Sequence, residues 1–195
     1  MSTSRLSCRF EKALVYAFHL HVDQTRKGSS VPYVSHLLSV AALVMEDGGD
    51  EDEAIAALLH DAVEDQGGRE TRLEISRQFG ERVAGIVDGC TDTDETPKPP
   101  WRERKERYVA HIEDASPEVR RVSMADKLHN SRTILADLER HGDKVWERFK
   151  GRKEGSLWYY RTLVESYRKG GDGYLFRELE RVVDEMEKLA RESRK

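Results

Sequence analysis

Apolar residues recur three or four positions apart along most of this chain, which is the period of an amphipathic α-helix. The pattern is clearest near the two ends, at Phe10, Leu14, Ala17, Phe18 and Val22 and at Leu175, Leu179, Val182, Met186 and Leu189. No segment shows the sustained alternation of apolar and polar residues that indicates a half-buried strand. The pattern therefore predicts an all-α protein, folded as a compact bundle of several helices.

Capping residues, glycines and prolines divide this pattern into separate helices. Pro32 is predicted to open one helix, Thr71 and Glu74 to form a capping box, and Ser116 to cap a long helix. The segment 91–100, which contains three prolines, is predicted to be a loop. The predicted helices cover 10–24, 32–47, 54–64, 71–79, 83–87, 102–112, 117–138, 157–167 and 175–189.

Composition narrows the range of partners and locations. The 195 residues are enough for one ordinary domain, and we assign 1–195 to a single domain. A net charge of −4 gives no support for binding nucleic acid through its phosphates. Cys8 and Cys90 are far apart, which favours a reducing compartment. With no apolar leader at the start and no run of the roughly 20 apolar residues that a membrane span needs, we expect a cytoplasmic protein with no membrane partner.

The most informative stretch is 58–66, which carries His60, Asp61, Glu64 and Asp65 among aliphatic residues. If the stretch is helical, residues four apart share one face, and one turn presents an imidazole and three carboxylates. Carboxylates this close repel one another, and a bound cation or a shifted pKa relieves that cost. The alternative is a solvated acidic helix end.

Two other helices offer polar side chains that could join this group. His36 follows a proline-initiated turn, and Asp126 lies in an otherwise apolar segment, where an unpaired carboxylate would be costly. Lys127 is discounted as the partner of Asp126, because adjacent residues on a helix do not face each other. Two imidazoles and two carboxylates suit Mn²⁺, Fe²⁺ or Zn²⁺. Glu64 and Asp65 would then be free to orient or deprotonate a water molecule.

These motifs, in this order, resemble the HD superfamily of metal-dependent phosphohydrolases. More specifically, they are similar to the hydrolase domain of the RelA/SpoT-homologue family, in the stand-alone form of the small alarmone hydrolases. The residues that carry the resemblance are Gln-Thr-Arg-Lys at 24–27, Pro-Tyr-Val-Ser-His at 32–36, Ala-Ala-Leu-Leu-His-Asp-Ala-Val-Glu-Asp at 56–65, Phe-Gly-Glu-Arg-Val at 79–83, Val-Asp-Gly-Cys-Thr-Asp at 87–92 and Ala-Asp-Lys-Leu-His-Asn at 125–130. The resemblance covers about 10–138.

The resemblance implies removal of the 3′-pyrophosphate from guanosine tetra- or pentaphosphate (ppGpp or pppGpp), with Mn²⁺ as the usual ion. It implies His36, His60, Asp61 and Asp126 as metal ligands and Glu64 and Asp65 as the catalytic carboxylates. It implies nucleotide binding by Arg26, Lys27 and Asn130, and offers Lys98 and Tyr159 for the phosphates and the base. Lys98 lies in a loop that is longer than the corresponding loop of the family. For Tyr159, packing in the core is an equal alternative to a place beside the base.

Three functional alternatives follow from the same residues. The first is the guanosine tetraphosphate hydrolase, without a synthetase activity, because no second domain is expected. The second is a phosphatase with the same metal site that acts on NADPH or another phosphorylated nucleotide. The third is a non-catalytic nucleotide-sensing module. The sequence does not indicate the oligomeric state.

Overall fold

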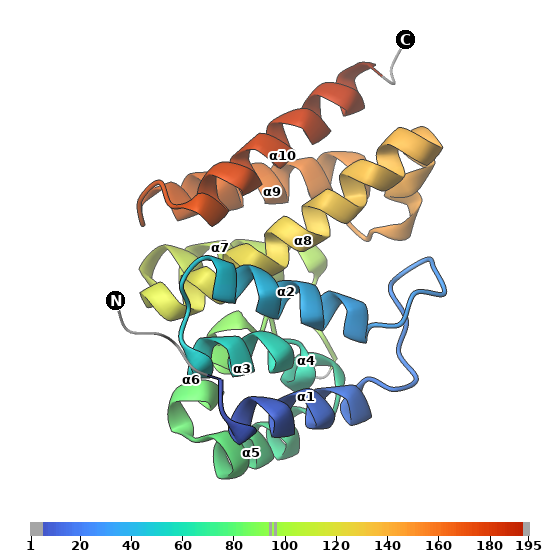
Figure 1. Cartoon of the computed structure of the whole chain (residues 1–195). Helices are drawn as coiled ribbons and strands as arrows, with labels where there is room; N and C mark the ends of the chain where they lie inside the picture. The colour runs from blue at the N-terminus through green and yellow to red at the C-terminus, as the bar shows by residue number, and fades with distance from the viewer. Residues whose placement is uncertain (1–5, 94, 96, 193–195) are drawn as a thin grey trace.

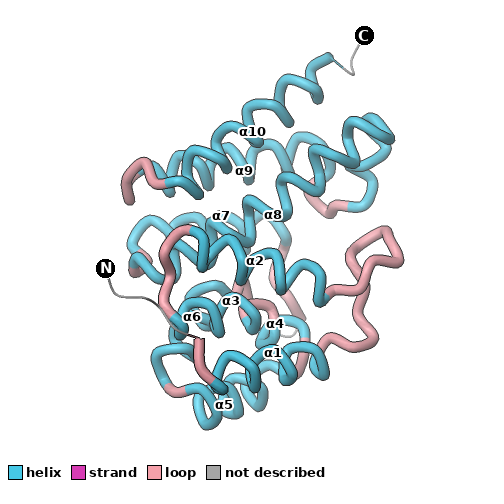
Figure 2. The backbone as a smooth tube through the Cα atoms, in the orientation of Figure 1, coloured by secondary structure: helices cyan, strands magenta, loops and turns pink. Residues whose placement is uncertain are grey.

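The protein is built from helices packed in layers around one long central helix. A computed structural model describes residues 6–93, 95 and 97–192, and over that part of the chain it contains no strand (Figures 1 and 2). The all-α prediction is therefore confirmed. The helices are α1 (Cys8–Leu20), α2 (Val34–Glu46), α3 (Glu51–Leu59), α4 (Ala62–Asp65), α5 (Gly68–Phe79), α6 (Glu81–Cys90), α7 (Trp101–Asp114), α8 (Pro117–His141), the 3-10 helix η1 (Gly142–Arg148), α9 (Arg152–Arg168) and α10 (Tyr174–Glu192).

The central helix, α8, begins where its sequence predicts. The Ser116 hydroxyl accepts a hydrogen bond from the Val119 amide, and Pro117 occupies the first turn. α8 separates α2 and α3 on one side from α9 and α10 on the other (Figure 1). Buried residues from α1 to α10 form one continuous core. The assignment of 1–195 to a single domain stays a prediction, since 1–5 and 193–195 lie outside the described residues.

The predicted helix over 54–64 is wrong at both of its ends. α3 begins earlier, because Asp50 and Glu53 form a reciprocal capping box. It ends at Leu59, and a separate short helix, α4, begins at Ala62. His60 and Asp61 therefore occupy a turn between two helices, not the middle of one. This break decides where the polar side chains of the stretch point.

Three other local predictions are also wrong. Thr71 does not cap a helix, because α5 already begins at Gly68 and the Thr71 hydroxyl donates to the Gln66 carbonyl. Pro32 precedes α2 and pairs with Thr25 in an isolated bridge of the α1–α2 loop. Phe18 and Val22 are 46% and 55% exposed, so only part of the first apolar stripe faces the core.

No helix within the described residues combines the length and the apolar character that crossing a bilayer requires.

Candidate active site

His36, His60, Asp61 and Asp126 come together where α2, α8 and the α3–α4 turn meet. Nε2 of His36 lies 3.2 Å from Oδ1 of Asp126 and 3.6 Å from Oδ2 of Asp61. Nε2 of His60 lies 3.0 Å from Oδ2 of Asp61 and 3.6 Å from Oδ1 of Asp126. Two ligand atoms ~2.1 Å from one ion lie ~3.0 Å apart at right angles and ~4.2 Å apart on opposite sides, so the four separations fall within the range found around a six-coordinate cation. We call these four residues the floor.

The two histidines are arranged as metal ligands are. Nδ1 of His60 lies 2.8 Å from the carbonyl oxygen of Ala57, so the ring carries its proton on Nδ1 and keeps the Nε2 lone pair free. Both Nε2 atoms are buried without a hydrogen-bond partner among the described residues. An unpaired buried nitrogen is costly, and a metal ion relieves that cost. His36, His60 and Asp126 together offer one ligand atom each within 4.8 Å of one another, so the residues present fit a divalent ion.

The floor carboxylates are oriented by hydrogen bonds from outside the group. The Tyr33 hydroxyl donates to Oδ2 of Asp61 at 2.6 Å. The amide of Asn130 and the ammonium of Lys127 donate to the two oxygens of Asp126. Burial by itself would raise the pKa of Asp126, but the Lys127 ammonium, together with His36 and His60, holds that pKa well below the usual range. Asp126 is therefore ionised, as a carboxylate ligand of a metal must be.

The prediction that discounted Lys127 is wrong. Its Nζ lies 2.5 Å from Oδ2 of Asp126, although the two residues are adjacent on α8. The long lysine stem curves back to the carboxylate, which the spacing argument did not consider. Burial would lower the pKa of Lys127, but Asp126, together with Tyr108, Tyr159 and Tyr167, raises it well above the usual value.

Glu64 and Asp65 point to different sides. Oε1 of Glu64 lies 2.8 Å from Nζ of Lys98, and its other oxygen is 3.4 Å from the Asp92 amide. Oδ2 of Asp65 accepts from the Gln24 side chain at 2.9 Å. Although Asp65 retains contact with solvent, partial loss of hydration and then the nearby Asp61 carboxylate raise its pKa. The two carboxylates thus differ in surroundings, which is how paired acids acquire separate roles.

A cleft of about 520 Å³ opens above the floor. All the predicted site residues line it except His36 and His60, which are buried. Two groups of basic side chains contribute to its lining, and we call each of them a wall. The first wall consists of Arg26 and Lys27 from the α1–α2 loop with Arg148 and Lys150, and the second wall consists of Lys98, Arg104 and Lys105.

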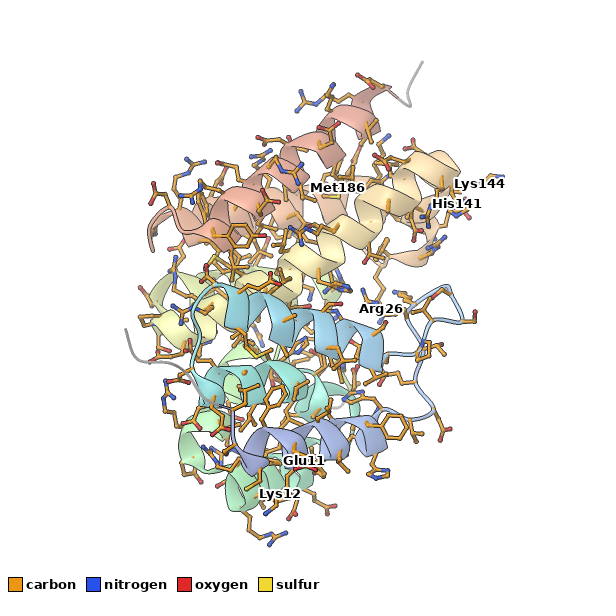
Figure 3. All side chains as sticks on the ribbon, in the orientation of Figure 1. Glu11, Lys12, Arg26, His141, Lys144 and Met186 are labelled. Carbon is orange, nitrogen blue, oxygen red and sulfur yellow. The ribbon has the colours of Figure 1, made fainter. Side chains whose placement is uncertain are left out.

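Arg26, Lys27 and Asn130, which the resemblance implies as nucleotide-binding residues, all line the cleft. The guanidinium of Arg26, from the α1–α2 loop (Figure 3), donates to Oδ1 of Asn130 on α8 at 2.6 Å. The Lys27 ammonium lies 5.6 Å from the centre of the Phe149 ring. Partial burial, followed by repulsion from Lys150, lowers the pKa of Lys27. Cations held this close together favour an anion between them.

The surroundings of Tyr159 are compatible with both predictions made for it, core packing and a place beside the base. It is only 6% exposed and packs against Trp101, Trp158 and Tyr160. It also lines the cleft, where its buried hydroxyl has no hydrogen-bond partner within the described part of the chain. Nζ of Lys105 lies 4.8 Å from the centre of its ring.

The sequence left the basic start of α7 (Arg102, Arg104, Lys105 and Arg107) open between a phosphate funnel and a solvated face. The basic start of α7 divides into two parts: Arg104 and Lys105 line the cleft and pair with Asp92, whereas Arg102 and Arg107 are more than half exposed. Burial, and then the Lys127 charge, lowers the pKa of Lys105 to about 7. Arg148, outside the recognisable motifs, gave no signal.

Comparisons with known proteins agree with this geometry. An HD domain family model matches residues 13–156. The guanosine-3′,5′-bis(diphosphate) 3′-pyrophosphohydrolase MESH1 of Xenopus tropicalis is 38% identical over 138 residues, which are 69% of this chain and 72% of that protein. A solved structure described as a metazoan ortholog of SpoT that hydrolyses ppGpp has a TM-score of 0.77 and 28% identity, covering 93% of this chain and 97% of that one. The structure of lmo0812 from Listeria monocytogenes EGD-e has a TM-score of 0.68 and 30% identity, covering 76% of this chain and 96% of that one.

Proposed function

Because the chain belongs to the HD domain family, whose fold implies a divalent metal ion, we propose that it is a Mn²⁺-dependent hydrolase of guanosine tetra- and pentaphosphate. It would remove the 3′-pyrophosphate and leave GDP or GTP. The name of the Xenopus tropicalis relative and the description of the metazoan structure support this substrate. The observation that carries the proposal is the convergence of His36, His60, Asp61 and Asp126 at the floor of a cleft with two basic walls.

The proposed metal ligands are the four floor residues. A divalent ion bound there would lower the pKa of a water molecule and polarise the phosphoryl group. Mn²⁺ suits the mixed imidazole and carboxylate donors. Lys127 and Asn130 orient Asp126, and Tyr33 orients Asp61, so the carboxylates need no rearrangement when the ion binds.

Glu64 and Asp65 are the proposed proton-transfer groups. In the reaction, the water oxygen bonds to the proximal phosphorus and the bond from that phosphorus to the ribose 3′-oxygen breaks. Glu64 is proposed to accept the water proton. Asp65, whose pKa is raised, is proposed to donate a proton to the departing 3′-oxygen. Gln24 holds Asp65 in place through a 2.9 Å hydrogen bond.

The walls are proposed to bind the charged parts of the nucleotide. Arg26, Lys27 and Asn130 on one side and Lys98 on the other would hold the phosphates, with Tyr159 beside the base. Charge-assisted hydrogen bonds of this kind are stronger than neutral ones. Lys98 contacts Glu64 directly, so substrate phosphate and Glu64 would compete for its ammonium. A cytoplasmic location is also proposed, supported by two free cysteines.

A substrate panel tests the proposal. Purified protein with Mn²⁺, Mg²⁺ or Zn²⁺ is incubated with guanosine tetraphosphate, guanosine pentaphosphate and NADPH, and pyrophosphate and phosphate release are measured separately. We expect pyrophosphate from both guanosine nucleotides, with Mn²⁺ giving the highest rate. Phosphate release from NADPH without pyrophosphate release from either guanosine nucleotide would contradict the proposed substrate. Nucleotide binding without turnover would instead support a sensing module.

A further inference from the structure

A third histidine, His129, lies next to the floor, in direct contact with His36. We propose that His129 is a positioning residue: its Nδ1 accepts a hydrogen bond from Nδ1 of His36, and this bond directs the other nitrogen of His36 at the metal. The inference rests on the metal site of the proposed function but does not depend on the substrate. It assigns a role to a residue that the floor and the walls leave unused.

The contact has the geometry of a hydrogen bond between two imidazoles. The two Nδ1 atoms lie 2.8 Å apart, with ring centres separated by 4.8 Å. The His36 ring is fully buried. A buried ring N–H requires an acceptor. For Nε2 of His36 to offer a lone pair to a cation, the ring proton must lie on Nδ1, which makes His129 Nδ1 the acceptor.

The two ligand histidines are therefore oriented by different means. His60 donates to the carbonyl of Ala57, and a carbonyl can only accept. His129 accepts only while its own ring is neutral and protonated on Nε2.

Helix geometry links this acceptor to the metal site. His129 follows Asp126 by three positions on α8, so the two side chains share one face of that helix. A single turn of α8 thus supplies a proposed ligand and the acceptor for a ligand on α2. The orientation of His36 consequently depends on the packing of α2 against α8, which form part of one core.

Nuclear magnetic resonance tests the hydrogen bond in the unmodified chain. With ¹⁵N-labelled histidine, a scalar coupling between the two Nδ1 atoms is expected across the N–H···N bond, in metal-free and in Zn²⁺-loaded protein. The His36 ring should show its proton on Nδ1 in both forms. Absence of the coupling in both forms, or a His36 proton on Nε2 in the loaded protein, would overturn the proposal.

Two substitutions test its effect on metal affinity. His129→Asn keeps an acceptor, because Oδ1 of asparagine takes nearly the position of Nδ1, whereas His129→Leu removes it. By calorimetry with Mn²⁺, we expect about 10- to 100-fold weaker binding for the leucine variant and wild-type-like binding for the asparagine variant. His141→Leu, the same change at an exposed position of α8, is the control.

The outcomes separate the inference from the proposed function. Wild-type protein that binds no Mn²⁺ would contradict the proposed metal site. Wild-type binding retained by His129→Leu, or lost equally by both variants, would contradict the role of His129 alone. Thermal unfolding of the metal-free variants shows whether the leucine variant folds. If it does not, the asparagine variant and the coupling in the wild-type chain decide the question.

Discussion

The floor and the walls of the cleft hold their side chains in different ways. His36 and His60 are buried, and each has one ring nitrogen fixed by a hydrogen bond. Lys98 of the second wall is 41% exposed and depends on one ion pair with Glu64. Groups that must meet a metal at fixed distances need a rigid environment, whereas groups that bind a flexible polyanion can adapt. The proposed reaction thus depends on buried groups, whereas the walls combine exposed residues such as Lys98 with buried ones such as Arg104.

The largest expected effect comes from removing a carboxylate at the floor. Asp61→Ala should weaken Mn²⁺ binding by more than about 100-fold and reduce turnover to background, because a proposed ligand is lost together with its charge. Calorimetry and pyrophosphate release measure the two losses. Asp114→Ala, an exposed aspartate at the end of α7, is the control. Full activity in Asp61→Ala would show that the floor is not the metal site.

A smaller effect is expected one turn later, at Glu64. Glu64→Gln keeps the shape of the side chain and should keep Mn²⁺ affinity, but it removes the proton acceptor. We expect kcat to fall by about 10²- to 10⁴-fold. Glu70→Gln, an exposed glutamate on α5, provides the comparison. Normal turnover by Glu64→Gln, or loss of its metal as in Asp61→Ala, would contradict the separate roles proposed for Asp61 as a metal ligand and Glu64 as the proton acceptor.

The smallest effect is expected at the second wall and depends on pH. Lys105 has a pKa of about 7, lowered by burial and then by Lys127, so its ammonium is present below that pH and lost above it. KM for guanosine tetraphosphate should therefore rise between about pH 7 and 9. Lys105→Arg stays charged and should remove the rise, whereas Lys105→Met should show a KM about tenfold higher already at pH 6.

Steady-state kinetics at saturating Mn²⁺, with KM and kcat determined separately at each pH, checks this expectation. A role in substrate binding predicts that KM changes and kcat does not. If wild-type protein and Lys105→Arg share the same KM profile, another group produces the pH dependence. A kcat change of the same size in Lys105→Met would place Lys105 with the proposed catalytic groups.

Local sequence determined the helical class and the identity of the floor. Spacings of three and four residues predict helices because the helix period is 3.6, and Ser116-Pro117 predicts the start of α8 because caps are local. Asp126 stands out because a charged group in an apolar segment is unusual, and the four floor residues together match the motifs of the HD superfamily. The same local reasoning placed His60 and Asp61 within a helix, and it did not foresee the break after Leu59.

Only the tertiary structure decided how these groups work together. It directs Glu64 toward Lys98 and Asp65 toward Gln24, brings Lys127 back onto Asp126, and places His129 against His36. It also divides the basic start of α7 into cleft-lining and exposed residues. Burial and through-space charge set these contacts and the pKa of Lys105, and both depend on neighbours from distant parts of the chain. Periodicity along the sequence carries no information about those neighbours.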